Sequence, residues 1–118
     1  MPIIEIWALP QAASIDVPSA LRQVSVDVAD FLHEESRGTW AIFHPIGSGH
    51  YAEGDDSPAT QPEETHPALV RVFANRRPEL VRSLLEAVGD AVIRAFGLSE
   101  GNVVVRFEPA DQERMYWG

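Results

Sequence analysis

The sequence predicts an α+β fold in which two successive β-α-β units form one four-stranded sheet with both helices on one face. Apolar residues along the 118-residue chain follow strand-like runs and helical spacing in the order strand, helix, strand, twice over. The two halves also match each other, which indicates an internal duplication. Offset by 64 residues, Leu21, Val24, Val28, Phe43, Pro45 and Gly54 meet Leu85, Val88, Val92, Phe107, Pro109 and Gly118, and IIEIWA lies over LVRVFA at an offset of 66.

The first half contains one strand, one helix and a second strand. Residues 3–9 form an apolar run rich in β-branched side chains, with one acid inside it, and this composition is typical of a mostly buried strand. A helix follows, with Asp16 as a candidate cap and Pro18 in its first turn, and Gly38 is expected to end it. Residues 39–46 form the second strand.

The second half repeats this order after a long polar break over residues 47–66, which is rich in Gly, Pro and acids. A loop of this length inside a small domain is functional or mobile. A third strand is predicted over residues 69–74, a helix between Pro78 and Gly97, and a fourth strand over residues 102–108.

The chain length suits a single domain over residues 1–118. We expect half-repeats over residues 2–54 and 67–118, joined by the acidic segment 55–66. Two β-α-β units of this size leave one sheet face without helices. Because apolar side chains on that face would be costly in water, we expect the protein to oligomerise through the sheet.

Composition excludes several classes of function. The formal net charge of −9, from 9 basic and 18 acidic residues, argues against nucleic-acid binding. The absence of cysteine excludes disulfides and thiol nucleophiles. No apolar stretch approaches a membrane span, and the start shows no signal peptide, so a cytoplasmic protein without membrane contact is expected.

The start Met-Pro-Ile-Ile, the duplicated β-α-β unit and the glycine-containing tail after each unit together resemble the tautomerase superfamily. Its best-known members are 4-oxalocrotonate tautomerase, carboxymethyl-hydroxymuconate isomerase and macrophage migration inhibitory factor. The resemblance spans nearly the whole chain and fails over the acidic segment. It implies a fused pair of β-α-β units that assembles as a homotrimer and acts on a small-molecule carboxylate substrate.

Pro2 is the candidate catalytic residue. Removal of Met1 would leave its nitrogen as a secondary amine, and a terminal amine ordinarily has a pKa of about 8. Burial or a nearby arginine favours the neutral form, which takes a proton from carbon and returns it elsewhere. This proton transfer is a tautomerisation, and it needs no cofactor.

Arginines are the candidate carboxylate binders, because a guanidinium offers a bidentate fork to a carboxylate and stabilises an enolate. The resemblance places Arg77 opposite a substrate-binding arginine of 4-oxalocrotonate tautomerase, with Arg76 beside it. A second arginine of that enzyme matches Trp40 or Val104 here. Arg106 lies two positions further along the same strand face and is the candidate substitute.

Two aromatic residues are candidates for the pocket wall. Tyr51 lies in SGHYAEG, which resembles the segment that carries a pocket aromatic in the family. Trp117 occupies the corresponding tail of the second half, beside Met115 and Tyr116. Each of these residues has an alternative structural role, as the cover of a hairpin or as part of a subunit interface.

The sequence is also compatible with other functions. No spacing of the four histidines matches a metal motif, so no metal site is expected. Relatives within the family dehalogenate, hydrate or decarboxylate, using a protonated proline with an acid or tyrosine, and this tail offers Glu108, Asp111, Glu113 and Tyr116. A non-catalytic ferredoxin-like binding domain would also have the order βαββαβ.

Overall fold

A computed structural model of the protein describes residues 2–47, 49–52, 54, 68–111 and 113–116. Met1, Trp117 and the predicted acidic segment 55–66 therefore lie outside the described residues. The elements are β1 (Ile3–Ala8), α1 (Val17–Leu32), the short 3-10 helix η1 (Ser36–Gly38), β2 (Trp40–Pro45), β3 (Ala68–Ala74), α2 (Pro78–Phe96) and β4 (Val103–Pro109).

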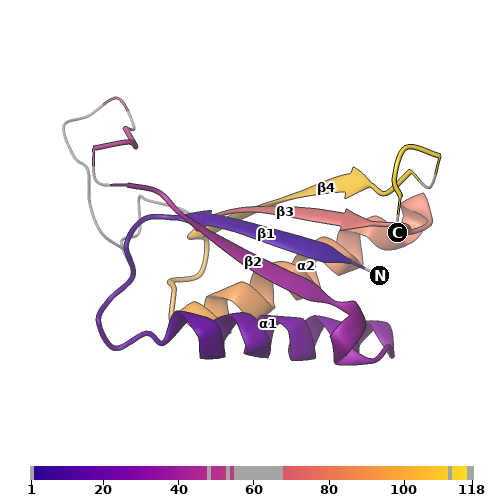
Figure 1. The fold of residues 1–118 in the computed structure, drawn as a ribbon, viewed down its shortest axis with the longest axis horizontal. Helices are drawn as coiled ribbons and strands as arrows, with labels where there is room; N and C mark the ends of the chain where they lie inside the picture. The colour runs from indigo at the N-terminus through magenta and orange to yellow at the C-terminus, as the bar shows by residue number, and fades with distance from the viewer. Residues whose placement is uncertain (1, 48, 53, 55–67, 112, 117–118) are drawn as a thin grey trace.

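The strands form one mixed sheet in the order β2-β1-β3-β4, and both helices pack on the same face (Figure 1). The sequence prediction of a tandem β-α-β fold is confirmed. Within each unit the two strands are parallel neighbours, and the two units meet where β1 and β3 pair antiparallel. In a ferredoxin-like, split β-α-β arrangement another strand would separate the parallel pair.

The two units repeat each other in backbone hydrogen bonding. The Ile46 nitrogen donates to the Ala8 oxygen at 2.8 Å, and the Ala110 nitrogen donates to the Ala74 oxygen at 3.0 Å. These bonds are related by the same offsets of 64 and 66 residues that match the two halves of the sequence.

The helices cover the sheet with one apolar stripe each, as their spacing predicts. The core between the layers is formed by side chains from both halves, including Ile4, Ile6, Val24, Val28, Val70, Val72, Leu84, Val88, Val92 and Phe96. Alternation along the strands then places the remaining strand residues on the opposite face, which no helix covers.

The helix ends differ in chemistry. α2 ends at the predicted Gly97, which takes the left-handed conformation with φ 64°. α1 ends earlier than expected, because His33 takes the same conformation with φ 57° and Gly38 belongs to η1. Histidine is one of the few side chains that enter this region with any frequency, so the signal for the end of the helix is weaker there than at a glycine.

At the other end of α1, Asp16 occupies the cap position, but its carboxylate accepts from the Ser19 hydroxyl at 2.5 Å rather than from a backbone N–H.

The face without helices is called the open face below. Its residues form three rows across β2, β1, β3 and β4: Trp40, Ile3, Phe73 and Glu108; Ile42, Glu5, Arg71 and Arg106; His44, Trp7, Leu69 and Val104. Several large apolar side chains are exposed here, including Trp40 at 46 % and Val104 at 53 %. Among the described residues, no helix has the length and apolarity needed to cross a membrane.

Candidate active site

Pro2 lies directly before β1 and is fully buried. Ile3 pairs with Phe73, so β1 begins where the antiparallel β3 ends. We call this end of the sheet, where β1 and β2 begin and β3 and β4 end, the Pro2 end (Figure 1). The segment after β3 and the tail after β4 both begin at this end.

Arg76 and Arg77 are brought to the Pro2 end, because both follow β3 directly. Their environments differ. The Arg77 side chain is 75 % exposed, and its Nε lies 3.5 Å from an oxygen of Glu79. Arg76 is half-buried, and its Nε is buried without a hydrogen-bond partner among the described residues. Of the two arginines, Arg76 is therefore the one whose Nε is buried and lacks an acceptor among the described residues.

The tail after β4 also lies at the Pro2 end, since the Ala110 nitrogen bonds to the last residue of β3. Asp111 holds the turn of this tail, with one oxygen accepting from the Glu113 nitrogen at 3.0 Å and the other 3.3 Å from the Arg114 Nε. Tyr116 is 92 % exposed. Trp117, the predicted pocket aromatic of this tail, is outside the described residues.

Tyr51 and Arg106 are not brought to Pro2 within one chain. Tyr51 follows β2, whose last residue lies at the opposite end of the sheet (Figure 1). Arg106 does share the open face with Val104, as strand alternation predicts, but it stands in the middle row. Its Nη2 bonds to an oxygen of Glu108 at 2.9 Å.

A charge cluster occupies the centre of the open face. Arg71 donates two hydrogen bonds to one oxygen of Glu5, from Nε at 2.8 Å and from Nη2. The Arg71 Nη1 also lies 3.6 Å from Glu108. The hydrogen bonds with Glu5 raise the pKa of Arg71 above its usual value, so this guanidinium stays charged at physiological pH. The four charges of Glu5, Arg71, Arg106 and Glu108 cancel.

Aromatic rings border this cluster. The rings of Trp7 and His44 stack with centroids 4.4 Å apart, and the His44 Nε2 lies 3.5 Å from the second oxygen of Glu5. These two atoms do not form a hydrogen bond, since the His44 Nε2 has no hydrogen-bond partner among the described residues. The Arg71 guanidinium carbon lies 4.7 Å from the centre of the Phe73 ring and 5.3 Å from that of Trp7.

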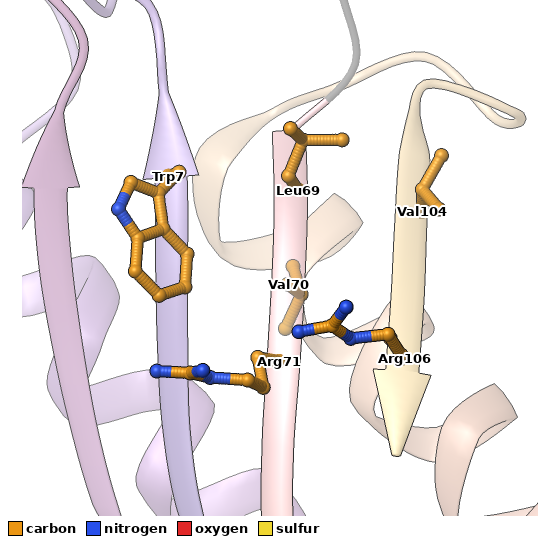
Figure 2. Close-up of a pocket in the computed structure, with 6 residues that line it drawn as sticks. All are labelled: Trp7, Leu69, Val70, Arg71, Val104 and Arg106. Atoms are coloured by element: carbon orange, nitrogen blue, oxygen red, sulfur yellow. The ribbon is translucent and has the colours of Figure 1, made fainter. Parts of the chain in front are cut away.

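A cavity of about 280 Å³ lies on the open face, lined by Trp7, Leu69, Val70, Arg71, Val104 and Arg106 (Figure 2). Its apolar wall is formed by the row that is furthest from Pro2, and the two arginines border it toward the middle of the sheet. The cavity is therefore separate from the Pro2 end within one chain.

The Glu5–Arg71 pair was not among the predicted site residues, although the sequence carries a signal for it. Each of the matched segments IIEIWA and LVRVFA has one charged residue among apolar ones, at the same position and with opposite sign. Antiparallel pairing of two such strands places the charges opposite each other when the middle positions coincide. Only the register of β1 and β3 established that they do.

No protein-family model and no curated protein sequence matches this chain. Solved structures with the same fold do match. Pt0534 inactivated by 2-oxo-3-pentynoate has a TM-score of 0.75 at 18 % identity, over 96 % of this chain and 89 % of its own. A wild-type fused 4-OT, seen as a symmetric trimer, has a TM-score of 0.73 at 18 % identity over the same shares. Malonate semialdehyde decarboxylase has a TM-score of 0.71 at 14 % identity, over 98 % and 90 %. These likenesses confirm the fold that the sequence resemblance implied.

Proposed function

We propose that this chain, which shares its fold with tautomerase-superfamily proteins, is an enzyme of that superfamily that moves a proton on a small keto-enol or unsaturated carboxylic acid. Pro2, freed by removal of Met1, is the general base and then the general acid. The observation that carries this proposal is that a fully buried Pro2 and an arginine whose Nε is buried without an acceptor among the described residues lie at the same end of the sheet.

The chemistry follows from what each group can do. The Pro2 nitrogen takes a proton from a substrate carbon, and the electron pair of that C–H bond moves to the carbonyl oxygen as an enolate. Burial of Pro2 favours the neutral amine that this step requires. The same proton returns from the nitrogen to another atom of the conjugated system. The reaction is balanced without a metal or cofactor.

Arg76 is the proposed carboxylate binder and enolate stabiliser, in preference to Arg77. A guanidinium N–H that is buried without an acceptor gains a charge-assisted hydrogen bond when an anion enters. The exposed Arg77 already has Glu79 nearby. The resemblance to 4-oxalocrotonate tautomerase instead places Arg77 opposite a substrate-binding arginine of that enzyme.

We further propose a homotrimer, assembled through the open face and in the cytoplasm. Exposed apolar side chains on β2, β3 and β4 favour burial of this face. The charges of the central cluster cancel, so a partner need not supply a counter-ion. Tyr51 and Arg106 lie away from Pro2 in their own chain, so any contact with substrate requires that they come from a neighbouring copy. The fused 4-OT trimer has the same fold.

A second candidate is a hydratase, decarboxylase or dehalogenase of the same superfamily. The acids after β4 lie at the Pro2 end, and the decarboxylase with this fold favours that alternative. In this case Pro2 acts protonated, and Asp111 or Glu113 activates water. A non-catalytic binding domain is the third candidate, and the adjacency of the parallel strands speaks against its ferredoxin-like form.

Pro2→Ala tests the proposal. We expect tautomerase activity on phenylpyruvate and 2-hydroxymuconate to fall by roughly 100-fold or more, because general base catalysis by a positioned group typically contributes that much. Intact mass must first show that Met1 is absent, since an amide nitrogen has no basic lone pair.

Light scattering on the same samples checks the assembly. A trimer supports the proposal, whereas a dimer favours a binding domain. Activity that is unchanged in Pro2→Ala would refute proline catalysis, and conversion of an unsaturated or keto acid to a hydrated or decarboxylated product would favour the second candidate.

A further inference from the structure

Thr39 lies at the Pro2 end of the sheet, directly before β2, and is only 3 % exposed. Its hydroxyl has no hydrogen-bond partner among the residues that the structure describes. A hydroxyl buried without a partner is destabilising, because it loses its hydrogen bonds with water and regains none. Packing alone therefore does not explain a threonine at this position.

Pro2 is the neighbour of Thr39 on the next strand. The Trp40 nitrogen donates to the Pro2 oxygen at 3.1 Å, and Ile3 pairs with Trp40. Continuing this register by one residue places Pro2 beside Thr39. Both side chains lie on the helix side of the sheet, since the following residue of each strand lies on the open face.

The Pro2 nitrogen is also directed toward β2. In an extended strand, the nitrogen and the carbonyl oxygen of one residue point toward the same adjacent strand. The Pro2 oxygen bonds to β2. A free amine at Pro2 would therefore be directed toward β2, where the Thr39 hydroxyl lacks a partner.

The second half of the chain provides an internal comparison. At the offsets that relate the halves, Pro2 corresponds to Ala68 and Thr39 to Val103, and Ala68 and Val103 are register partners in the sheet. Valine has nearly the shape of threonine without the hydroxyl. The polar version of this residue thus occurs beside the candidate amine, and the apolar version occurs where no amine exists.

We infer that the Thr39 hydroxyl is the hydrogen-bond partner of the Pro2 amine and positions it for proton transfer; this inference rests on the proposed role of Pro2. When the amine takes a proton from the substrate carbon it carries two N–H groups. One is donated to the Thr39 Oγ1, and the other is left toward the substrate and returns its proton there. The bond is strongest to the protonated amine, because a charged donor strengthens it.

Thr39→Val tests this inference in protein whose intact mass shows that Met1 is absent. The readout is the nitrogen chemical shift of Pro2 across pH, in protein labelled with isotopically heavy proline. Loss of the acceptor weakens the protonated form, so we expect the titration midpoint to fall by roughly one pH unit. We expect kcat to fall roughly tenfold, and Thr39→Ser to keep both values close to those of the unchanged protein.

Stability separates this role from a structural one. In protein that carries an N-terminal extension Pro2 has no amine, and the Thr39 hydroxyl then has no partner among the described residues. There Thr39→Val should leave the unfolding temperature equal to or above that of the extended parent protein, whereas a structural threonine would lower it. Val103→Thr is the matched control in the other half and should leave the Pro2 titration unchanged.

The outcomes also separate this inference from the proposed function. A Pro2 midpoint unchanged by Thr39→Val overturns the role of Thr39, even where Pro2→Ala abolishes activity. A shifted midpoint supports it even where no tautomerase activity is found, since the titration needs only the free amine. Retention of Met1 overturns both.

Discussion

The two β-α-β units share one backbone arrangement but carry different polar and charged side chains. In both units an equivalent backbone hydrogen bond lies at the end of the parallel strand pair, and both contribute a helix with a buried apolar stripe. Their differences are concentrated at the sheet. The first unit supplies Pro2 and Thr39 at the Pro2 end, and the second supplies Arg76 to the same end. A site at this end therefore needs both units.

The clearest difference lies on the approximate two-fold axis between the units. Glu5 and Arg71 occupy equivalent positions at an offset of 66, and they are also register partners across β1 and β3. In a symmetric pair of identical units, a residue on the axis would face its own copy, and a charged residue would meet a like charge. A single fused chain escapes this constraint, since it can place a carboxylate on one side and a guanidinium on the other.

Among the predicted changes, replacement of Arg76, which only the second unit provides, should have the largest effect. The equivalents of Arg76 and Arg77 after β1 are Pro10 and Gln11. We expect Arg76→Gln to lower kcat/KM by roughly 10- to 100-fold through the loss of a charge-assisted hydrogen bond. Steady-state kinetics on a carboxylate substrate measures this, and the matched variant Arg77→Gln should change kcat/KM less than threefold (about 0.6 kcal/mol). Equal losses in the two variants would contradict the assignment to Arg76.

Charge reversal on the axis should have the next largest effect. Glu5→Arg and Arg71→Glu each restore the like-charge pairing of a symmetric dimer, so each should lower the unfolding temperature by roughly 5–10 °C. Thermal unfolding followed by circular dichroism measures this. The double variant exchanges the two charges and should recover more than half of the loss. Additive losses would show that the two side chains are not coupled.

Substitutions at the residues that end the two helices should have the smallest effect. His33 ends α1 and Gly97 ends α2 in the same left-handed conformation. His33→Gly should raise the free energy of unfolding by about 0.5–1 kcal/mol, and Gly97→Ala should lower it by about 1 kcal/mol. A Cβ at Gly97 would meet only Ile15 at an ordinary 3.8 Å, so backbone strain alone sets this cost. Urea denaturation measures both changes, and a shift of the same sign in the two variants would contradict the comparison.

Local sequence patterns were sufficient to predict the helices and strands and their order along the chain. Alternation in residues 3–9 and helical spacing after Pro18 and Pro78 depend on the residues themselves, because a strand or an amphipathic helix buries a side chain at a fixed period. The repeat then implied two β-α-β units with both helices on one face of the sheet. The helix boundary at Gly38 was wrong, since a left-handed histidine leaves little trace in the sequence.

The candidate site depended on the register between strands, which no local pattern contains. The sequence by itself determined that Pro2 directly precedes a buried strand and that two arginines follow another. Only the tertiary structure decided that those two strands run antiparallel, so that Pro2 and Arg76 share one end while Tyr51 and Arg106 lie elsewhere. It also decided that the Arg76 Nε is buried, that Glu5 faces Arg71 and that Thr39 lies beside Pro2. The physical reason is that burial and partnership are properties of neighbours in space, and pairing brings together residues far apart in the chain.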